Sequence, residues 1–489
     1  MGILSLLLWT PAIGALIITF VSAQNSRIIR WVANLFTLIA LVFSCTMVAM
    51  FDLSNPQLQF SEYAVLNPKL GSAYSLGVDG LSAPMVVLAT LLTSVAMLAS
   101  LNISGWIKGY HICLLVLEFG LLGVFLSQDW SIFYIFWELT LIPLFFLINR
   151  WGGKRRHAAS LNFVLYTMGG SVFMLLSVIA IYQHVHGHDS LMSDMSQASR
   201  LMPMHQQVLA LLGFLIGFGV KLPIFPLHGW LPLAHVEAPS PVSVLLSGIL
   251  LKMGSYGLIR TVTMLPDAAH LLQPLLVFLA LFGMVYGGLL AWRQTDLKAM
   301  IAYSSISHMG IVLLGIATLN ENGLKGAVLQ MTAHGLVAGS MFLLVGLLYE
   351  RTHTRNIQDY SSLIQVMPRF AIFMTLTLFA AMGLPGTVGF IAELHALIGG
   401  FQEWEGLMAI FSLTLLIGAS YAIRTITLLF TGPVRPQLQH IADLKTHEFI
   451  AAGLLVFAII LFGLYPAPLI ALSESTIEQL HQQETAGSD

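Results

Sequence analysis

Charged residues are scarce in this sequence. Asp, Glu, Lys and Arg make up 9% of its 489 residues, whereas 57% are apolar and the mean hydropathy is +0.84. Soluble domains carry about 25% charged residues, so the composition excludes a soluble protein. Apolar runs long enough to span a bilayer, about 20 residues each, recur along the chain and leave no stretch for a soluble domain. We therefore predict one all-α polytopic membrane domain over residues 1–489.

Cysteine pairs and the usual cofactor motifs are also missing. Cys45 and Cys113 are the only cysteines, and both lie inside apolar runs, which excludes disulfide or metal spacing. There is no CxxC, no GxGxxG opening a helix after a strand, no phosphate-binding loop and no haem ligation pattern. We expect no cofactor and no metal in this chain, so whatever drives it acts elsewhere. Residues 3–21 lack a charged n-region and read as a first span, not a signal peptide.

The apolar runs predict fourteen transmembrane helices joined mostly by short loops. They begin near Ile3, Ile29, Gly80, Ile112, Ser131, Phe163, Gln207, Pro241, Leu272, Ala299, Gly326, Ala371, Gly406 and Phe449. The longest loops cover residues 51–79 and 183–205. Residues 1–110 hold spans 1–3, and residues 431–489 hold the last span and a polar tail, for which we expect a short interfacial helix with a frayed end.

Lys and Arg are distributed unequally between the two sets of loops. The larger set consists of fourteen residues: Arg27, Arg30, Lys108, Arg150, Lys154, Arg155, Arg156, Arg293, Lys298, Arg351, Arg355, Arg369, Arg435 and Lys445. The opposite set holds Lys69, Arg200, Arg260 and Lys325. By the positive-inside rule, we predict that both termini lie on the outer side of the membrane. Composition does not identify the organism, but a bacterial cytoplasmic (inner) membrane, with both termini periplasmic, fits best. Arg424 lies in a span and is expected to snorkel to the cytoplasmic face.

The seventh span contains a predicted helix break beside a lysine. Lys221 is followed by Pro223 and Pro226, and each proline removes a backbone donor and clashes with the preceding turn. In lipid such a break is tolerated only where the freed carbonyls face protein or a water-filled cavity. A lysine at membrane depth costs about 2.5–3.5 kcal/mol on insertion scales. Transporters hold and release ions at broken helices, so this stretch predicts movement of protons or another small cation.

A second predicted break lies five spans later. The twelfth span reads MGLPGTVGFIAELHAL, with Pro385 and Gly386 before Glu393. An odd offset of five spans reverses the direction of the helix, which is the arrangement of inverted repeats. We therefore predict two inverted five-helix repeats related by a pseudo-two-fold axis in the membrane plane. Spans 4–8 (residues 111–262) form one repeat, and spans 9–13 (residues 271–430) form the other.

Four ionisable residues lie well inside predicted spans: Glu138, Lys221, Lys252 and Glu393. A structural ion pair is the alternative, but acids and bases spread over four spans are harder to explain as one pair. Intramembrane charges are functional by default. A carboxylate about 4 Å from a lysine stabilises the charged lysine by about 4 kcal/mol at an effective dielectric constant of about 20. Movement of Glu138 relative to Lys221 would therefore load or discharge the lysine.

Two helix histidines fall in sequence between Lys252 and Glu393. Ser304 precedes His308 by one turn, and Gln330 precedes His334 by one turn. A histidine titrates near neutral pH and suits a proton shuttle, although a packing role stays open for each. Lys252 itself lies on a face of small and polar residues that would bind water, with Ser247 and Gly248 before it and Ser255 and Tyr256 after it.

The remaining polar positions carry weaker signals. Glu118 stands alone on an apolar helix, where a proton-entry role or contact with a neighbouring subunit are both open. Asp79 and Asp296 stand at span starts and are predicted N-caps. His184, His186 and His188 have a spacing that a metal would accept, but an exposed polar loop is favoured.

Five stretches together resemble one known family. They are FWELTLIPLFFL, VKLPIFPLHGWLP, AHVEAPSPVSVLLSGILLKMGSYGLIR, QTDLKAMIAYSSISHMG and GLPGTVGFIAELHAL. The chain resembles, over nearly its whole length, the M-subunit (NuoM) family of bacterial respiratory complex I, the mitochondrial NADH dehydrogenase subunit 4 family. The resemblance implies an antiporter-like subunit of a proton-translocating NADH:quinone oxidoreductase. FMN, iron–sulfur clusters and quinone would then belong to other subunits. The implied partners are L-type and N-type antiporter-like subunits and membrane lipids, with no nucleic acid.

The resemblance also implies roles for individual residues. Glu138 would partner the pumping lysine, Lys221 would be that lysine, Lys252 would link towards the centre, His308 and His334 would be axis histidines, and Glu393 would be the terminal acid of the exit half-channel. Sister L and N subunits and related cation antiporter subunits tend to carry lysine at the position of Glu393. The family turn LPDAH has Leu233 here in place of its acid, so any role of that acid in proton entry is absent or moved.

Two alternative functions remain at the level of sequence. The first is a subunit of a multi-subunit Na⁺/H⁺ antiporter or of a membrane-bound hydrogenase, which neighbouring genes would reveal. The second is a passive scaffold, for which neutralising Glu138 or Lys252 would alter assembly but not the proton stoichiometry. Either H⁺ or Na⁺ remains open as the coupling ion.

Overall fold

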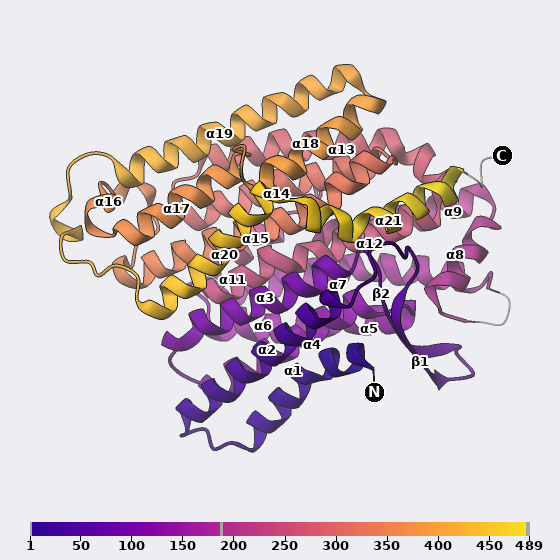
Figure 1. Cartoon of the computed structure of the whole chain (residues 1–489), viewed down its shortest axis with the longest axis horizontal. Helices are drawn as coiled ribbons and strands as arrows, with labels where there is room; N and C mark the ends of the chain where they lie inside the picture. The colour runs from indigo at the N-terminus through magenta and orange to yellow at the C-terminus, as the bar shows by residue number, and fades with distance from the viewer. Residues whose placement is uncertain (1, 186–188, 486–489) are drawn as a thin grey trace.

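A computed structural model describes residues 2–185 and 189–485, and its helices form one elongated bundle (Figure 1). Within these ranges thirteen helices are long and apolar enough to cross a membrane. The shorter α17 (Pro368–Ala381), continued after a break by α18 (Val388–Glu403), adds one more crossing. The all-α polytopic prediction with about fourteen spans is confirmed.

The other spanning helices follow in chain order. They are α1 (Ile3–Phe20), α2 (Ser26–Ala49), α3 (Ala83–Ala99), α4 (Ile107–Leu126), α5 (Trp130–Leu139) with α6 (Leu141–Trp151), α7 (Arg156–Tyr182), α9 (Met204–Lys221) with α10 (Trp230–Glu237), α11 (Ser240–Leu245) with η2 (Leu246–Leu250) and α12 (Leu251–Met264), α13 (Pro266–Arg293), α14 (Leu297–Ala317), α15 (Glu321–Thr352), α19 (Met408–Phe430) and α20 (Thr446–Leu464). Shorter or peripheral helices are η1 (Ser100–Asn102), α8 (Met192–Arg200), η3 (Ile357–Asp359), α16 (Leu363–Val366), η4 (Glu405–Leu407), η5 (Pro436–Leu438) and α21 (Ala467–Thr485).

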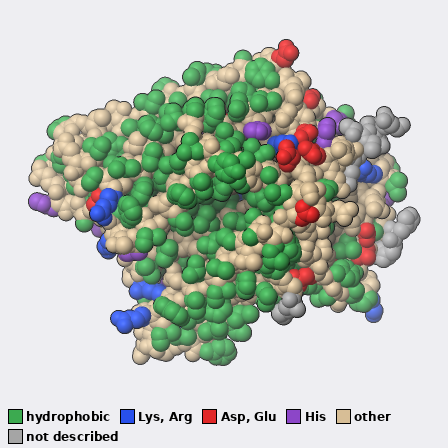
Figure 2. Space-filling view, in the orientation of Figure 1, with side chains coloured by type: hydrophobic (Ala, Val, Ile, Leu, Met, Phe, Trp, Pro, Cys, Tyr) green, Lys and Arg blue, Asp and Glu red, His purple; other side chains and the backbone are tan. Residues whose placement is uncertain are grey.

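The two ends of the bundle differ. At one end, which we call the hairpin face, α1 begins, α21 ends, and α8 lies beside a two-stranded sheet (Figure 1). The sheet pairs β1 (Gln59–Asn67) with β2 (Ser72–Val78) in antiparallel register, with Ala64 opposite Tyr74. This hairpin corrects the prediction of a plain loop over residues 51–79. We call the opposite end the basic face, because most Lys and Arg side chains visible in Figure 2 gather there.

The flanks of the bundle present apolar side chains to their surroundings, as the green surface in Figure 2 shows. Leu165, Leu209, Leu271, Leu416 and Phe457 are each more than half exposed. A soluble protein rarely exposes contiguous apolar patches of this extent, whereas a lipid-facing surface requires them. The most deeply buried spans are α11–α12 and α15, so these two form the centre of the bundle.

Both predicted helix breaks are present. The helix α9 ends at Lys221 and α10 begins at Trp230, while α17 ends at Ala381 and α18 begins at Val388. At the first break, Trp230 Nε1 donates to the freed carbonyl of Val220 at 2.8 Å. Protein therefore satisfies the backbone, as the bilayer requires. The two broken spans run in opposite directions, as inverted repeats would, while the pseudo-two-fold relation and the division at residues 111–262 and 271–430 stay predictions.

Two further irregularities were not predicted. The fifth span is interrupted at Thr140 between α5 and α6, because the ring of Pro143 crowds the carbonyl four residues earlier, at Leu139. The eighth span contains a π-helical turn, η2, immediately before Lys252. Such a turn inserts an extra residue into the helix and occurs frequently at functional sites.

Charged pairs fasten the later helices at both faces. At the hairpin face, Lys325 of α15 pairs with Glu321 and with Glu474 and Glu478 of α21. At the basic face, Arg351 of α15 pairs with Glu448 of α20. The prediction that Lys325 lies in a loop is therefore wrong, since it lies in the first turns of α15.

Replacing Arg351 with Met should destabilise the packing of α20 against α15. Glu448 is 2% exposed, and its carboxylate would lose a buried partner, which costs about 3–5 kcal/mol. The expected result is a lower midpoint of thermal unfolding of the detergent-solubilised protein. Arg435→Met is the matched control, because Arg435 is exposed at the same face. Equal midpoints for the two variants would contradict a stabilising role for the pair.

Candidate functional site

Lys221 is fully buried at the end of α9, where the helix breaks. Its Nζ donates to the carbonyl of Trp137 at 3.4 Å and to the hydroxyl of Thr140 at 3.2 Å. The same ammonium lies 3.8 Å from the centre of the Trp137 ring, a cation–π contact. Both oxygen atoms that accept from Lys221 lie at the interruption of the fifth span near Thr140. The surroundings of Lys221 are therefore formed by the broken fifth and seventh spans.

Glu138 follows Trp137 in the chain and is half-buried. Its carboxylate lines an apolar groove of about 680 Å³ between α5, α6 and α7, whose walls include Ile135, Phe146 and Met168. Among the described residues, Glu138 Oε1 is buried without a hydrogen-bond partner, and no ion pair joins Glu138 to Lys221. The two predicted partners are thus neighbours along the fold without direct contact.

Lys252 is fully buried in the centre of the bundle. Its Nζ donates to the carbonyl of Ser247, in the π-helical turn, at 2.7 Å, and lies 2.7 Å from Nδ1 of His334. The hydroxyl of Ser247 meets that of Ser305 at 3.1 Å. The extra residue of the π turn therefore aims a backbone carbonyl at the ammonium group. The predicted polar face around Lys252 provides one backbone contact, and the histidine comes from α15.

His308 connects the centre to Glu393. Its Nδ1 lies 3.8 Å from Glu393 Oε1, and the centres of the His308 and His334 rings are 5.7 Å apart. Gln330 Nε2 lies 3.4 Å from His308 Nδ1, so this amide contacts His308 and not, as its spacing predicts, His334. Tyr421, from α19, reaches the other ring nitrogen at 3.4 Å. The hydroxyl of Ser304 donates to the backbone of Ile301 at 2.8 Å.

The twelfth-span break makes room for Glu393. Gly383 adopts a φ of +70°, and a Cβ placed there would lie 2.2 Å from Glu393 Oε2. Only glycine accepts both the backbone conformation and the contact. Two cavities of about 10 Å³, each lined by His308 and Glu393, adjoin the carboxylate. Each has the size needed for about one water molecule.

The predicted residues therefore form two groups. Lys252, His334, His308 and Glu393 make one line of neighbours across α12, α15, α14 and α18. Lys221 and Glu138 form the second group on the other side of α12. Between the groups, Phe218 of α9 packs against α12 where it has glycines, with a Cβ at Gly257 lying 2.3 Å from the Phe218 ring. The interface between the groups is close-packed there.

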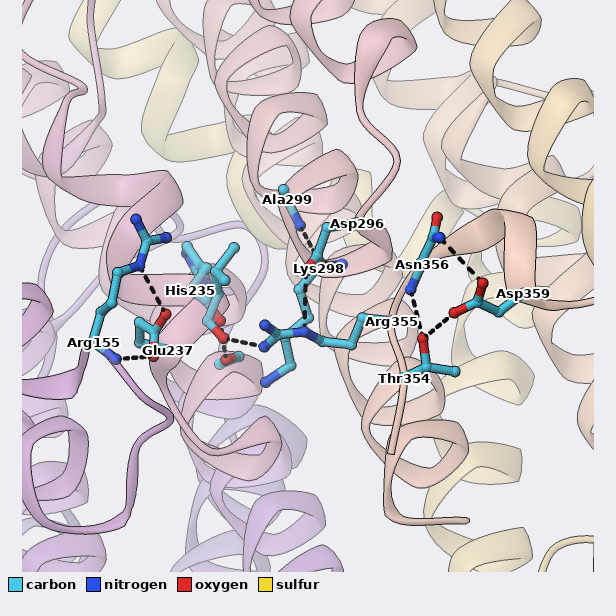
Figure 3. Close-up of polar contacts among 12 residues, drawn as sticks. Arg155, His235, Glu237, Asp296, Lys298, Ala299, Thr354, Arg355, Asn356 and Asp359 are labelled. Carbon is cyan, nitrogen blue, oxygen red and sulfur yellow. Dashed lines mark hydrogen bonds and ion pairs between the residues drawn. The ribbon is translucent and has the colours of Figure 1, made fainter. Parts of the chain in front are cut away.

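A third charged cluster, at the basic face, was missed at the level of sequence (Figure 3). Arg155 pairs with Glu237 at 3.4 Å, and Arg355 pairs with Asp296 at 3.0 Å. Lys298 is buried and donates to the carbonyl of Ala238 at 2.8 Å, so its assignment to an exposed loop is wrong. Asp296 caps α14 as predicted, accepting from the backbone of Lys298 and Ala299. A lysine two residues after a helix cap is the signal that would have placed Lys298 inside the helix.

The broken half-helix α10 carries the middle of this cluster. His235 is buried with both ring nitrogens unpartnered among the described residues, and it stacks on Phe342 at 4.7 Å. Leu233, which replaces the family acid, is partly buried on the same helix and packs against the apolar core. Glu237 lies one turn further on, where its carboxylate accepts a hydrogen bond from the backbone N–H of Arg155 at 2.9 Å.

The weaker candidates have mixed outcomes. Glu118 is fully buried, and both of its carboxylate oxygens lack a partner within the described ranges. Asp79 accepts from the backbone of Leu81 and Ser82, as a cap does, but it also pairs with Arg260. The prediction that Arg260 lies in a loop is wrong, since it lies in α12. Arg424 reaches the carbonyl of Trp292 at the basic end of α13, as snorkelling predicts.

The histidine cluster is described only in part. His184 Nδ1 lies 3.0 Å from the carbonyl of Ala180. His186 and His188 lie outside the described residues. Among the residues that the structure does describe, no group of three or more His, Cys, Asp or Glu side chains has a metal-binding arrangement.

Comparison with known proteins places this geometry in one family. The family model described as "NADH:quinone oxidoreductase/Mrp antiporter, TM" matches residues 127–418. The chain is 37% identical to NADH-quinone oxidoreductase subunit M of Rickettsia conorii, over 98% of both chains. It is 42% identical to NAD(P)H-quinone oxidoreductase chain 4 1 of Picosynechococcus sp., over 93% of this chain and 87% of the relative.

Solved structures agree. A chain of respiratory complex I from Thermus thermophilus with bound NADH matches with a TM-score of 0.88 and 30% identity, covering 98% of this chain and 99% of that one. A chain of the Mrp complex from Dietzia sp. matches with a TM-score of 0.84 at 22% identity, covering 96% of this chain and 52% of that one, which shows a shared fold alone. The chain therefore belongs to the family of NADH:quinone oxidoreductase and Mrp antiporter membrane subunits.

Proposed function

We propose that this chain is the M-type, proton-translocating membrane subunit of an NADH:quinone oxidoreductase. The observation that carries the proposal is the line of titratable side chains Lys252, His334, His308 and Glu393, buried across four helices at the centre of the bundle. Buried ionisable groups in a membrane mark ion pathways and proton relays. The similarity to subunits of that name over nearly the whole of both chains supports the same conclusion.

The line is spaced for proton transfer. Lys252 and His334 are in direct contact at 2.7 Å, within the 2.6–3.2 Å range over which a proton passes between heavy atoms. The other ring nitrogen of His334 is buried without a partner among the described residues, which leaves it for the next transfer, towards His308. The 3.8 Å between His308 and Glu393 is longer than a hydrogen bond, but the water-sized cavities beside both groups allow one water to bridge them.

The second group acts as the control element. Lys221 is held by neutral oxygens and an aromatic ring, while Glu138 lines its groove without an ion pair to Lys221. A carboxylate that swings to about 4 Å would stabilise the charged lysine by about 4 kcal/mol at an effective dielectric constant of about 20. A charge presented at the groove by the neighbouring antiporter-like subunit would draw Glu138 away or return it. In this way each subunit would pass a signal to the next.

The redox chemistry belongs, in this proposal, to other subunits, which would hold FMN, iron–sulfur clusters and quinone. The membrane partners would be L-type and N-type antiporter-like subunits together with lipid. We place the chain in the bacterial cytoplasmic membrane with the basic face in the cytoplasm and both termini periplasmic. The excess of Lys and Arg in one set of loops supports that orientation.

A role in an Na⁺/H⁺ antiporter is the main alternative. The chain covers nearly the full length of its quinone oxidoreductase relatives but about half of the matched Mrp chain. The acid at Glu393 also sets this chain apart from the lysine expected in antiporter subunits. Both observations favour the oxidoreductase.

Replacing Lys221 with Ala in the assembled complex should abolish or sharply reduce proton pumping. Alanine removes the cation at the break, so movement of Glu138 can no longer change the protonation of a lysine there. The measurement is protons translocated per electron in proteoliposomes during NADH oxidation. Lys154→Ala is the control, because Lys154 is an exposed lysine of the basic face. Unaltered coupling in the Lys221 variant would refute the proposal.

Replacing Glu393 with Gln should lower the proton stoichiometry while the complex still assembles. Glutamine fills the same space against Gly383 but does not release a proton at the end of the line. Native gel electrophoresis reports assembly, and the ratio of protons to electrons reports pumping. Glu403→Gln serves as control, since Glu403 is exposed at the far end of the same helix. A passive scaffold predicts the reverse: impaired assembly with a normal ratio.

A further inference from the structure

Beyond the pumping line, a buried ion pair closes the hairpin-face end of α12. Arg260 donates to Asp79, which stands at the start of α3, and its Nη2 also donates to the hydroxyl of Tyr256 at 3.1 Å. The guanidinium lies 5.0 Å from the centre of the Tyr256 ring. Asp79 is fixed in turn by the backbone N–H groups of Leu81 and Ser82. The arginine is therefore held by two side chains in a fixed position.

A polar cavity of about 630 Å³ lies directly against this pair. Asp79 and Arg260 line it together with Gln128, which precedes α5, and with side chains of α8 and α21, among them Gln197 and Gln479. These elements all belong to the hairpin face (Figure 1). The lining is rich in amides and hydroxyls, so the cavity suits water, and it brings the aqueous phase of that face to the guanidinium.

The same helix leads from the pair to the pumping line. Lys252, Tyr256 and Arg260 are spaced four residues apart, which places them on one face of α12 over a length of about 12 Å. Tyr256 is fully buried between the other two, with Phe125 against its ring at 5.4 Å. The Tyr256 hydroxyl therefore lies between the cavity and Lys252. A continuous path of water and side chains at this position would let protons return through the protein and uncouple the pump.

The chemistry of arginine suits a block. A guanidinium is not deprotonated in proteins, so it neither accepts a proton from the cavity nor passes one on. A fixed positive charge in a narrow polar passage also excludes protons and cations, as it does in channels. Arg260 Nε is buried and unpartnered among the described residues, so one N–H donor of the group makes no hydrogen bond there.

We infer that Arg260, positioned by Asp79 and Tyr256, is an electrostatic seal that keeps protons in the hairpin-face cavity from reaching Lys252. The seal confines proton release from Lys252 to the route through His334, His308 and Glu393. This inference rests on the proposed function, because it requires that Lys252 carries protons.

The test is the passive proton permeability of the assembled complex in proteoliposomes, without NADH. A pH step across the membrane and an enclosed pH-sensitive dye give the leak rate. We expect Arg260→Gln to raise the leak at least fivefold, and Arg260→Lys, which keeps the positive charge, to restore a low leak. Arg200→Gln, at another arginine lining the same cavity, is the matched control and should leave the leak unchanged.

Two further variants separate a seal from a structural ion pair. Asp79→Asn keeps the arginine's charge, so it should stay as tight as the parent protein, whereas loss of a merely structural pair would make it as leaky as Arg260→Gln. Adding Lys252→Ala to Arg260→Gln should remove the leak, because the route passes through the lysine. If Arg260→Gln alone does not assemble, the doubly neutral Asp79→Asn/Arg260→Gln variant buries no unpaired charge and should show the same leak.

The seal is overturned if the arginine-neutral complex is as tight as the parent. It is equally overturned if its leak persists without Lys252, or if Arg200→Gln or Arg260→Lys leaks as much. The leak is measured without electron transfer, so it does not depend on the pumping test at Lys221. A pump that is unaffected by Lys221→Ala would refute the proposed function even where Arg260→Gln leaks.

Discussion

A charge inside the thickness of a membrane must find polar partners within the protein, and this constraint shapes the centre of the bundle. Lys252 finds a backbone carbonyl and a histidine, and Lys221 finds a carbonyl, a hydroxyl and an indole ring. A regular helix has no carbonyl to spare for such a task, since each one accepts from its own helix. The backbone therefore departs from regular geometry wherever a charge is held.

An interruption or irregular turn of the helix lies close to each of the four intramembrane charges along the chain. The fifth span is interrupted next to Glu138, the seventh ends at Lys221, a π-helical turn precedes Lys252, and the twelfth is broken before Glu393. Irregular backbone at membrane depth is tolerated only against protein or water, so each break must be covered by neighbouring helices or by a water-filled cavity. Charge and irregular backbone thus occur together, and the charged residues fall into two groups, one around Lys221 and one from Lys252 to Glu393.

Much of this could be predicted from sequence, and the failures have physical reasons. Long apolar runs gave the spans, and Pro223 and Pro385 marked two breaks because a proline lacks its donor wherever it stands. The π-helical turn before Lys252 contains no proline that would predict it from the sequence. Helical spacing predicts which residues share a face but not which helix lies opposite, so Gln330 was assigned to His334 although it contacts His308. The pairing of Asp79 with Arg260, 181 positions apart, depends on packing of two distant spans.

Among so many interrupted helices, α15 stands out because it runs 32 residues without a break, about 48 Å. Lys325 ties one end to the C-terminal helix, and Arg351 ties the other to α20. His334 lies on this continuous helix between the two anchored ends. Because both ends of this unbroken helix are anchored, we expect His334 to keep its position when the interrupted helices beside it rearrange.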